Sequence, residues 1–179
     1  MLIHHITGGG GLELVVHEYG QPAGKSIVLI HGINQCSLVW QKQYGSALAE
    51  EFRLVCPDLR GHGMSDKPRD PEYYNQATLW ADDVHAVLSA LSLRKPILVG
   101  WSYGGYIIND YLAKYGQDAI GGINYLCAGV VMGGANTTQL LGRDFIGTIP
   151  GLCSDNLEDN IHAVRTLIRV LFAQQPSQE

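Results

Sequence analysis

The chain has 179 residues and is 46% hydrophobic, which suffices for one buried core and favours a single globular domain. A formal net charge of -5, with no block of basic residues, leaves no electrostatic reason to expect binding to nucleic acid or to an anionic membrane surface. No signal-peptide pattern opens the sequence and no apolar run approaches the roughly 18 residues of a membrane span, so we expect a cytoplasmic protein with small, neutral partners.

The four cysteines, Cys36, Cys56, Cys127 and Cys153, are scattered without C-x-x-C spacing. This scatter argues against a zinc site and offers no reason to invoke a disulfide framework. We therefore expect no metal, no cofactor and buried free thiols. A pairing of Cys36 with Cys56 stays open as an alternative.

The N-terminal segments have the composition of β-strands. Runs at residues 2–6 and 12–17 flank a tract of four glycines at 8–11, which permits a tight reversal and predicts a β-hairpin. Strands that are buried on both faces of a parallel sheet are continuously apolar. Four later runs have this character, the last of them more weakly: residues 26–30, 52–56, 96–100 and 122–127.

Between these strands lie segments with helical periodicity. Apolar side chains recur at the spacing of an amphipathic helix over residues 80–91 and, more briefly, over residues 40–48. Residues 102–115 can run as a helix until Gly116, which suits the position just after a helix end. The alternation of strand and helix predicts an α/β fold with a doubly wound, mostly parallel sheet.

The sequence changes character after the last predicted strand. Residues 128–134 are rich in glycine, and residues 142–156 are rich in turn formers. Residues 157–171 then have the spacing of another amphipathic helix. We therefore divide the chain into two parts, residues 1–128 and residues 129–179.

The pentapeptide Gly100-Trp101-Ser102-Tyr103-Gly104 matches G-x-S-x-G, follows a predicted buried strand and opens a predicted helix. A serine at such a turn is held in a strained backbone conformation, and larger residues in place of the glycines would collide with the neighbouring strand and helix. The turn projects the Ser102 hydroxyl out of the sheet and places the Tyr103 N–H at the positive end of a helix. Ser102 is therefore the predicted nucleophile; the structural alternative is a chance match in a glycine-rich chain.

Three segments occur together in order: His-Gly-Ile-Asn at 31–34, Pro-Asp-Leu-Arg-Gly-His-Gly-Met-Ser-Asp at 57–66, and Gly-Trp-Ser-Tyr-Gly-Gly at 100–105. In combination they resemble the α/β-hydrolase superfamily, and more narrowly its branch of carboxylesterases, non-haem haloperoxidases (perhydrolases) and carbon–carbon bond hydrolases. The resemblance implies that residues 1–128 are the N-terminal part of the hydrolase core and that residues 129–179 begin a helical cap. It also implies that the charged residues of the second segment are structural, so we assign them no catalytic role.

The resemblance places the second half of an oxyanion hole just after the strand at residues 26–30. An oxyanion hole needs two converging donors. We expect the backbone N–H of Ile33 to join that of Tyr103, with Gly32 letting the chain approach the substrate closely. His31 is expected to brace this loop. The residues expected to line the substrate pocket are His31, Gly32, Asn34 and Trp101.

The type of nucleophile narrows the reaction. Haloalkane dehalogenases and epoxide hydrolases of this superfamily carry aspartate where this chain has Ser102, which disfavours those reactions. A serine hydroxyl needs a positioned base, normally a histidine oriented by a carboxylate. We therefore expect a serine hydrolase that acts by acyl transfer on a small ester or related carbonyl substrate. Two alternatives stay open, a non-catalytic ligand-binding or interaction protein on the same scaffold and a perhydrolase that uses the same serine.

The expected triad is incomplete. In this fold the acid and the histidine follow the serine, on loops after later strands. His162 alone among the histidines lies beyond Ser102, and it falls inside a predicted helix. We expect an N-terminal portion of a hydrolase, whether a truncation, a proteolytic product or one chain of a split enzyme, that is nearly inactive alone. A complementing C-terminal fragment or a homo-oligomer would cover the exposed sheet edge.

Overall fold

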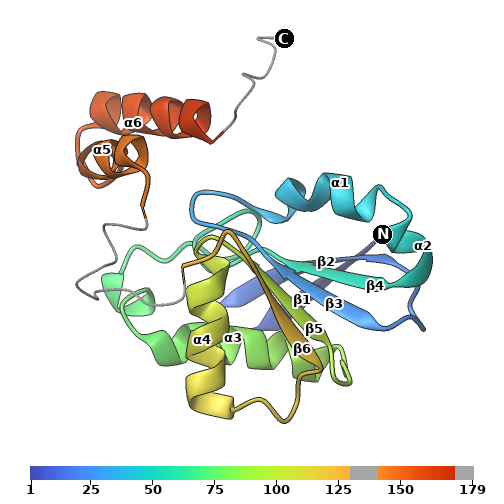
Figure 1. Ribbon diagram of the computed structural model, residues 1–179. Helices are drawn as coiled ribbons and strands as arrows, with labels where there is room; N and C mark the ends of the chain where they lie inside the picture. The colour runs from blue at the N-terminus through green and yellow to red at the C-terminus, as the bar shows by residue number, and fades with distance from the viewer. Residues whose placement is uncertain (130–140, 172–179) are drawn as a thin grey trace. The chain divides into compact units, whose positions relative to one another are not determined.

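The computed structural model describes residues 1–129 and 141–171, which belong to two compact units, residues 1–130 and residues 131–179. The first unit is built around a six-stranded sheet with the strand order β1-β2-β4-β3-β5-β6 (Figure 1). Its strands are β1 (Leu2–Thr7), β2 (Glu13–Gly20), β3 (Ser26–Ile30), β4 (Arg53–Pro57), β5 (Ile97–Trp101) and β6 (Gly122–Leu126).

Helices connect the parallel part of this sheet. The strand β2 is antiparallel to β1 and to β4, whereas the β3–β4, β3–β5 and β5–β6 pairs are parallel. The α/β class, the N-terminal hairpin and the mostly parallel sheet are thus confirmed. The helices of this unit are α1 (Gln41–Tyr44), α2 (Leu48–Glu51), α3 (Ala77–Ala90) and α4 (Gly104–Tyr115), and its 3₁₀ turns are η1 (Gly9–Gly11), η2 (Ser37–Trp40) and η3 (Pro71–Tyr73).

Different helices cover the two faces of the sheet (Figure 1). Along β3 the side chains alternate, so that Val28 and Ile30 belong to a core shared with α3 and α4, whereas Ile27 and Leu29 belong to a second core shared with α1 and α2. Full burial of an apolar side chain of this size stabilises the fold by about 1.5–3 kcal/mol. Both faces of β3 are therefore buried, which explains why its sequence is continuously apolar rather than alternating.

The register of the two central strands determines where the site lies. Ile30 pairs with Gly100 in the parallel β3–β5 ladder. Both strands end within two residues of this pair, so the chain leaves them at the same edge of the sheet. The loop that begins at His31 and the turn at Ser102 consequently emerge side by side.

The second unit contains the helices α5 (Arg143–Leu152) and α6 (Leu157–Val170), which pack against each other. The side chain of Asn156 caps α6 by accepting hydrogen bonds from the first-turn amides, which satisfies donors that lack partners within the helix. The predicted helix at 157–171 is confirmed. The expectation of turns over 142–156 is wrong for most of that stretch, because α5 forms there despite its two glycines and its proline. A Cβ on Gly151 would lie 2.7 Å from that of Ala163, so this glycine allows α5 to approach α6 closely.

All four cysteines are free thiols, so Cys36 and Cys56 are not paired. Cys56 is buried as expected and Cys36 is partly buried. The expectation of burial is wrong for Cys127 and Cys153, which are exposed. The helices in the described parts of the chain are all too short or too polar to cross a membrane.

Candidate active site

Ser102 occupies the turn between β5 and α4 with a φ of 52°. This left-handed conformation is strained for a residue with a side chain, at a cost of about 1–3 kcal/mol. Backbone hydrogen bonds hold the turn: the Ser102 N–H donates to the Leu126 carbonyl at 3.2 Å, and the Ser102 carbonyl accepts from Gly105 at 3.1 Å and from Gly129 at 3.3 Å. The strand–turn–helix geometry expected of a nucleophile elbow is therefore present.

Three glycines around Ser102 are required by close packing. A Cβ on Gly100 would lie 2.7 Å from the carbonyl oxygen of Gly104, and a Cβ on Gly104 would lie 2.5 Å from that of Ile30. A Cβ on Gly105 would come within 2.6 Å of the Ala128 side chain. The turn thus brings α4 so close to β3, β5 and the segment after β6 that only hydrogen fits at these positions.

We expect the substitution Gly104→Ala to lower the free energy of unfolding by about 1–3 kcal/mol, because the added methyl group would collide with rigid strand backbone. Urea denaturation followed by circular dichroism measures the loss. Gly122→Ala is the matched control, since a Cβ at Gly122 would meet no atom within 4 Å. Equal stability of the two variants would contradict the packing argument.

The loop after β3 lies against the nucleophile. A Cβ on Gly32 would lie 3.1 Å from the Cβ of Ser102. In the part of the chain that the structure describes, neither the Ile33 N–H nor the Tyr103 N–H has a hydrogen-bond acceptor, and Tyr103 occupies the N-cap position of α4. One of these N–H groups follows Ser102 directly and the other lies in the loop packed against it, so both are candidates for the two donors that an oxyanion hole needs.

His31 has no exposed surface, and both of its ring nitrogens are engaged. Its Nδ1 lies 2.7 Å from the carbonyl oxygen of Gly32, to which it donates, and its Nε2 accepts from the Leu59 N–H at 3.1 Å. Burial lowers the pKa of His31 to about 4, so the ring is neutral at physiological pH. His31 thus ties the loop after β3 to the loop after β4 and presents no atom to a ligand.

Asn34 and Trp101, two further residues expected to line the pocket, differ in their surroundings. Asn34 is exposed and has a φ of 57°. Trp101 is partly buried, and its ring meets that of Trp40 edge-on with centroids 6.3 Å apart. Trp101 therefore packs into the core on the α1 and α2 side of the sheet, whereas Asn34 is open to solvent.

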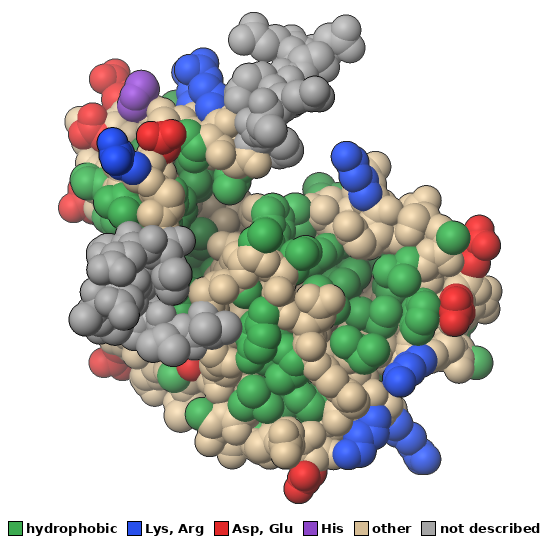
Figure 2. Space-filling model, viewed as in Figure 1, with side chains coloured by type: hydrophobic (Ala, Val, Ile, Leu, Met, Phe, Trp, Pro, Cys, Tyr) green, Lys and Arg blue, Asp and Glu red, His purple; other side chains and the backbone are tan. Residues whose placement is uncertain are grey.

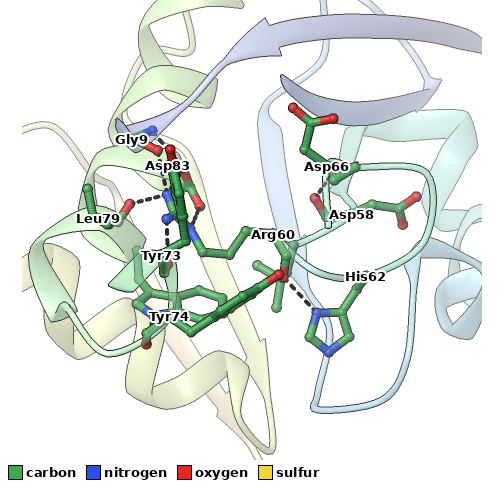
Figure 3. Close-up of polar contacts among 12 residues, drawn as sticks. Gly9, Asp58, Arg60, His62, Asp66, Tyr73, Tyr74, Leu79 and Asp83 are labelled. Carbon is green, nitrogen blue, oxygen red and sulfur yellow. Dashed lines mark hydrogen bonds and ion pairs between the residues drawn. The ribbon is translucent and has the colours of Figure 1, made fainter. Parts of the chain in front are cut away.

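The charged residues of the segment at 57–66 hold backbone groups. The buried carboxylate of Asp58 accepts from the Ser37 N–H at 2.7 Å and from the Met64 N–H at 2.8 Å. Arg60 is completely buried and forms an ion pair with Asp83 of α3, as Figure 3 shows. These contacts fix the conformation of the loop that faces the β3 loop.

Neither a histidine nor a carboxylate is hydrogen-bonded to the Ser102 hydroxyl within residues 1–129. His162 lies in α6, in the second unit, and is exposed. Residues 1–129 therefore bring together the elbow and the candidate oxyanion donors, and no charge-relay triad forms within that range.

Two side chains that sequence analysis gave no role bind the β3 loop. The Gly32 N–H donates to the side-chain oxygen of Gln35 at 2.9 Å, and the Asn34 N–H donates to the Nε2 of His62 at 3.2 Å. His62 lies within the segment at 57–66, but the contact joins residues 28 apart in the chain. Nothing in the local pattern at either residue predicts it.

A family model described as alpha/beta hydrolase fold matches residues 25–157 of this chain. The match covers well over half of the sequence and includes the β3 loop, the segment at 57–66 and the elbow. The chain therefore belongs to the α/β-hydrolase family, and the expected resemblance is confirmed.

Relatives of this chain include hydrolases of several kinds. A structure assigned as an aryl esterase of Burkholderia cenocepacia is 32% identical, with a TM-score of 0.89 over 99% of this chain and 63% of its own. An esterase of Rhodococcus sp. is 36% identical, with a TM-score of 0.85 over 93% of this chain and 60% of its own. A protein assigned as a non-heme chloroperoxidase of Synechocystis sp. is 36% identical over 98 residues. That match covers 55% of this chain and 34% of the relative, so the chain spans about a third of the relative's length.

Proposed function

We propose that this chain supplies the nucleophile and the oxyanion hole of a serine hydrolase that cleaves a small ester or a related carbonyl compound. The observation that carries the proposal is the strained Ser102 at a φ of 52°, flanked by the unpartnered N–H groups of Ile33 and Tyr103. Similarity to two esterases over more than nine-tenths of the chain supports this substrate class.

The geometry suits acyl transfer. The Ser102 oxygen would attack the carbonyl carbon of the ester while a base takes the hydroxyl proton, and the carbonyl oxygen would become an oxyanion. The N–H groups of Ile33 and Tyr103 would stabilise that charge, and loss of one such donor typically costs about 2.7–4 kcal/mol of transition-state stabilisation. The alcohol would leave with the proton from the base, and water would then release the acid from the acyl-enzyme.

We further propose that the base and its carboxylate come from polypeptide other than residues 1–129, either a complementing fragment or a second copy of the chain. The edge of the sheet supports this proposal. Strand β6 pairs with β5 on one side, and its Tyr125 and Leu126 are 40% and 42% exposed. Apolar side chains gather on the face of this unit that Figure 2 shows. Further polypeptide packed along β6 would cover apolar surface close to Ser102.

A perhydrolase reaction is the second candidate. It would use the same Ser102 and the same acyl-enzyme, with hydrogen peroxide replacing water as the attacking molecule and a peracid as the product. Similarity to a protein assigned as a non-heme chloroperoxidase favours this candidate. Peracid formation from an acyl ester and peroxide distinguishes it from simple hydrolysis.

A fluorophosphonate probe tests the nucleophile. We expect stoichiometric labelling of the intact assembly and slow labelling of this chain alone, because a serine without a base is a weak nucleophile. Ser102→Ala should abolish labelling, whereas the control Ser89→Ala, which changes an exposed serine on α3, should leave it intact. A folded assembly that does not label would instead support a non-catalytic ligand-binding protein.

A further inference from the structure

The backbone N–H groups of both neighbours of Ile33 are held by side chains. The Gly32 N–H donates to Gln35, and the Asn34 N–H donates to the Nε2 of His62. The Ile33 N–H between them is left without an acceptor in the described chain. Asn34 adopts a left-handed φ of 57°, a conformation that needs support from its surroundings.

The hydrogen bonds of His62 define its tautomer. The Nδ1 of His62 lies 2.9 Å from the carbonyl oxygen of Arg60, and Figure 3 shows this bond. A carbonyl oxygen can only accept, so Nδ1 carries the proton. In a neutral ring Nε2 then offers a lone pair, which is what the Asn34 N–H requires. His62 therefore accepts from Asn34 only while it is neutral.

The support beneath His62 is rigid. Arg60, whose carbonyl accepts from His62, is itself held by Asp83 through two hydrogen bonds of 2.7 Å. Its guanidinium also donates to three backbone carbonyls. A side chain anchored in this way can hold a neighbouring loop in one conformation.

We propose that His62 is a positioning residue for the oxyanion hole. Its neutral ring holds the Asn34 N–H and so keeps the adjacent Ile33 N–H in place beside Ser102. This assignment rests on the proposed function. His62 touches no reacting atom; it acts through the backbone of Asn34.

Protonation of His62 would break this arrangement, because a second proton on Nε2 would face the Asn34 N–H with another donor. The charged and titratable groups around the ring are Asp58, which favours protonation, Lys67, which opposes it, and His31, whose ring centroid lies 5.3 Å away. Burial has the largest effect and lowers the pKa of His62 below its usual 6.5. The loop is therefore expected to be intact at neutral pH and to open as the pH falls through this lowered pKa.

Amide exchange in the ¹⁵N-labelled chain tests the contact directly. At pH 7.5 the Asn34 amide should exchange at least about tenfold faster in His62→Ala than in the wild type, because its acceptor is lost. His62→Gln offers an amide oxygen in place of Nε2 and should restore protection. The exposed His85 on α3 supplies the control, and His85→Ala should leave Asn34 unchanged. In the wild type, the amide chemical shifts of Ile33 and Asn34 should change with pH together with those of the His62 ring. In His62→Gln the pH dependence that follows the His62 ring should vanish.

Kinetics of the intact assembly separate this assignment from the proposed function. His62→Ala should lower kcat by about tenfold or more with KM little changed, and His62→Gln should recover most of the loss, because oxyanion donors act in the transition state. If Ser102 is labelled by the probe but His62→Ala changes neither kcat nor Asn34 exchange, His62 is not a positioning residue and the proposed function stands. If Ser102 is never labelled, the proposed function fails, and this assignment fails with it. The wild-type titration requires no substitution, so it decides the matter even if His62→Ala does not fold.

Discussion

Replacement of Arg60 by methionine is expected to lower the free energy of unfolding by about 3–5 kcal/mol. Arg60 has no exposed surface, and its guanidinium donates two hydrogen bonds of 2.7 Å to the carboxylate of Asp83, which is also buried (Figure 3). Methionine can fill the space of the aliphatic stem but leaves Asp83 charged and without its cation. Loss of one partner from a buried pair leaves an uncompensated charge in a medium of low dielectric constant.

Arg60 also joins three segments that are distant in the sequence. Its guanidinium donates to the carbonyls of Gly9 in η1, Tyr73 in η3 and Leu79 in α3, at 2.8–3.0 Å. Each of these acceptors would lose its donor in the variant. A buried carbonyl without a partner costs about 1–3 kcal/mol where water does not replace the donor. The loss of stability in Arg60→Met should therefore lie at the upper end of the range that single substitutions produce.

Urea denaturation at pH 7, followed by circular dichroism, measures the effect of Arg60→Met. Arg94→Met provides the matched control, since Arg94 is exposed and its replacement should change stability by less than about 0.5 kcal/mol. The double variant Arg60→Met/Asp83→Leu should regain part of the loss, because it removes both buried charges. Equal stability of Arg60→Met and Arg94→Met would show that the buried pair contributes nothing.

The strands of the sheet could be predicted because the burial of each strand is reflected in that strand's own residue types. A strand covered on both faces is expected to be apolar along its length, and β3, β4 and β5 are, apart from Ser26 and Arg53 at the first positions of β3 and β4. The helix α5 was not predictable in the same way, because Gly147 and Pro150 are typical of turns. Its packing against α6, which brings Gly151 against Ala163, is a tertiary interaction that outweighs these local preferences.

The candidate site likewise has features that the sequence predicts and features that depend on tertiary contacts. The turn at Ser102 was predictable because close packing leaves room only for glycine at positions 100, 104 and 105, and these glycines are visible in the sequence. The roles of Gln35 and His62 were not, since the bond from Asn34 to His62 depends on how two loops meet. The complete burial of His31 likewise depends on the loop after β4, which supplies the Leu59 N–H. Sequence motifs therefore identified the candidate catalytic groups but not the side chains that hold the surrounding loops.

Acid should destabilise the sheet-containing unit through His31. The pKa of its ring is about 4 in the folded protein, because burial disfavours the charged form, and 6.5 is its ordinary value. The unfolded chain therefore takes up the proton first. The stabilisation that the neutral, hydrogen-bonded ring contributes is complete above pH 6.5 and is lost progressively as the pH falls towards 4. This difference in pKa between the folded and unfolded chain corresponds to about 3 kcal/mol in the free energy of unfolding.

The comparison of wild type with His31→Gln isolates this contribution. A glutamine amide has one donor and one acceptor group, as the neutral ring has, and it does not titrate. Carboxylates also titrate between pH 7.5 and 4, but they are common to both proteins and cancel in the difference. We therefore expect the free energy of unfolding, measured with urea, to fall more steeply with acid in the wild type than in His31→Gln, by up to about 3 kcal/mol at pH 4. His85→Gln alters an exposed ring and should keep the wild-type slope. Parallel pH profiles for wild type and His31→Gln would mean that folding does not lower the pKa of the His31 ring, and that burial between the β3 and β4 loops does not control acid stability.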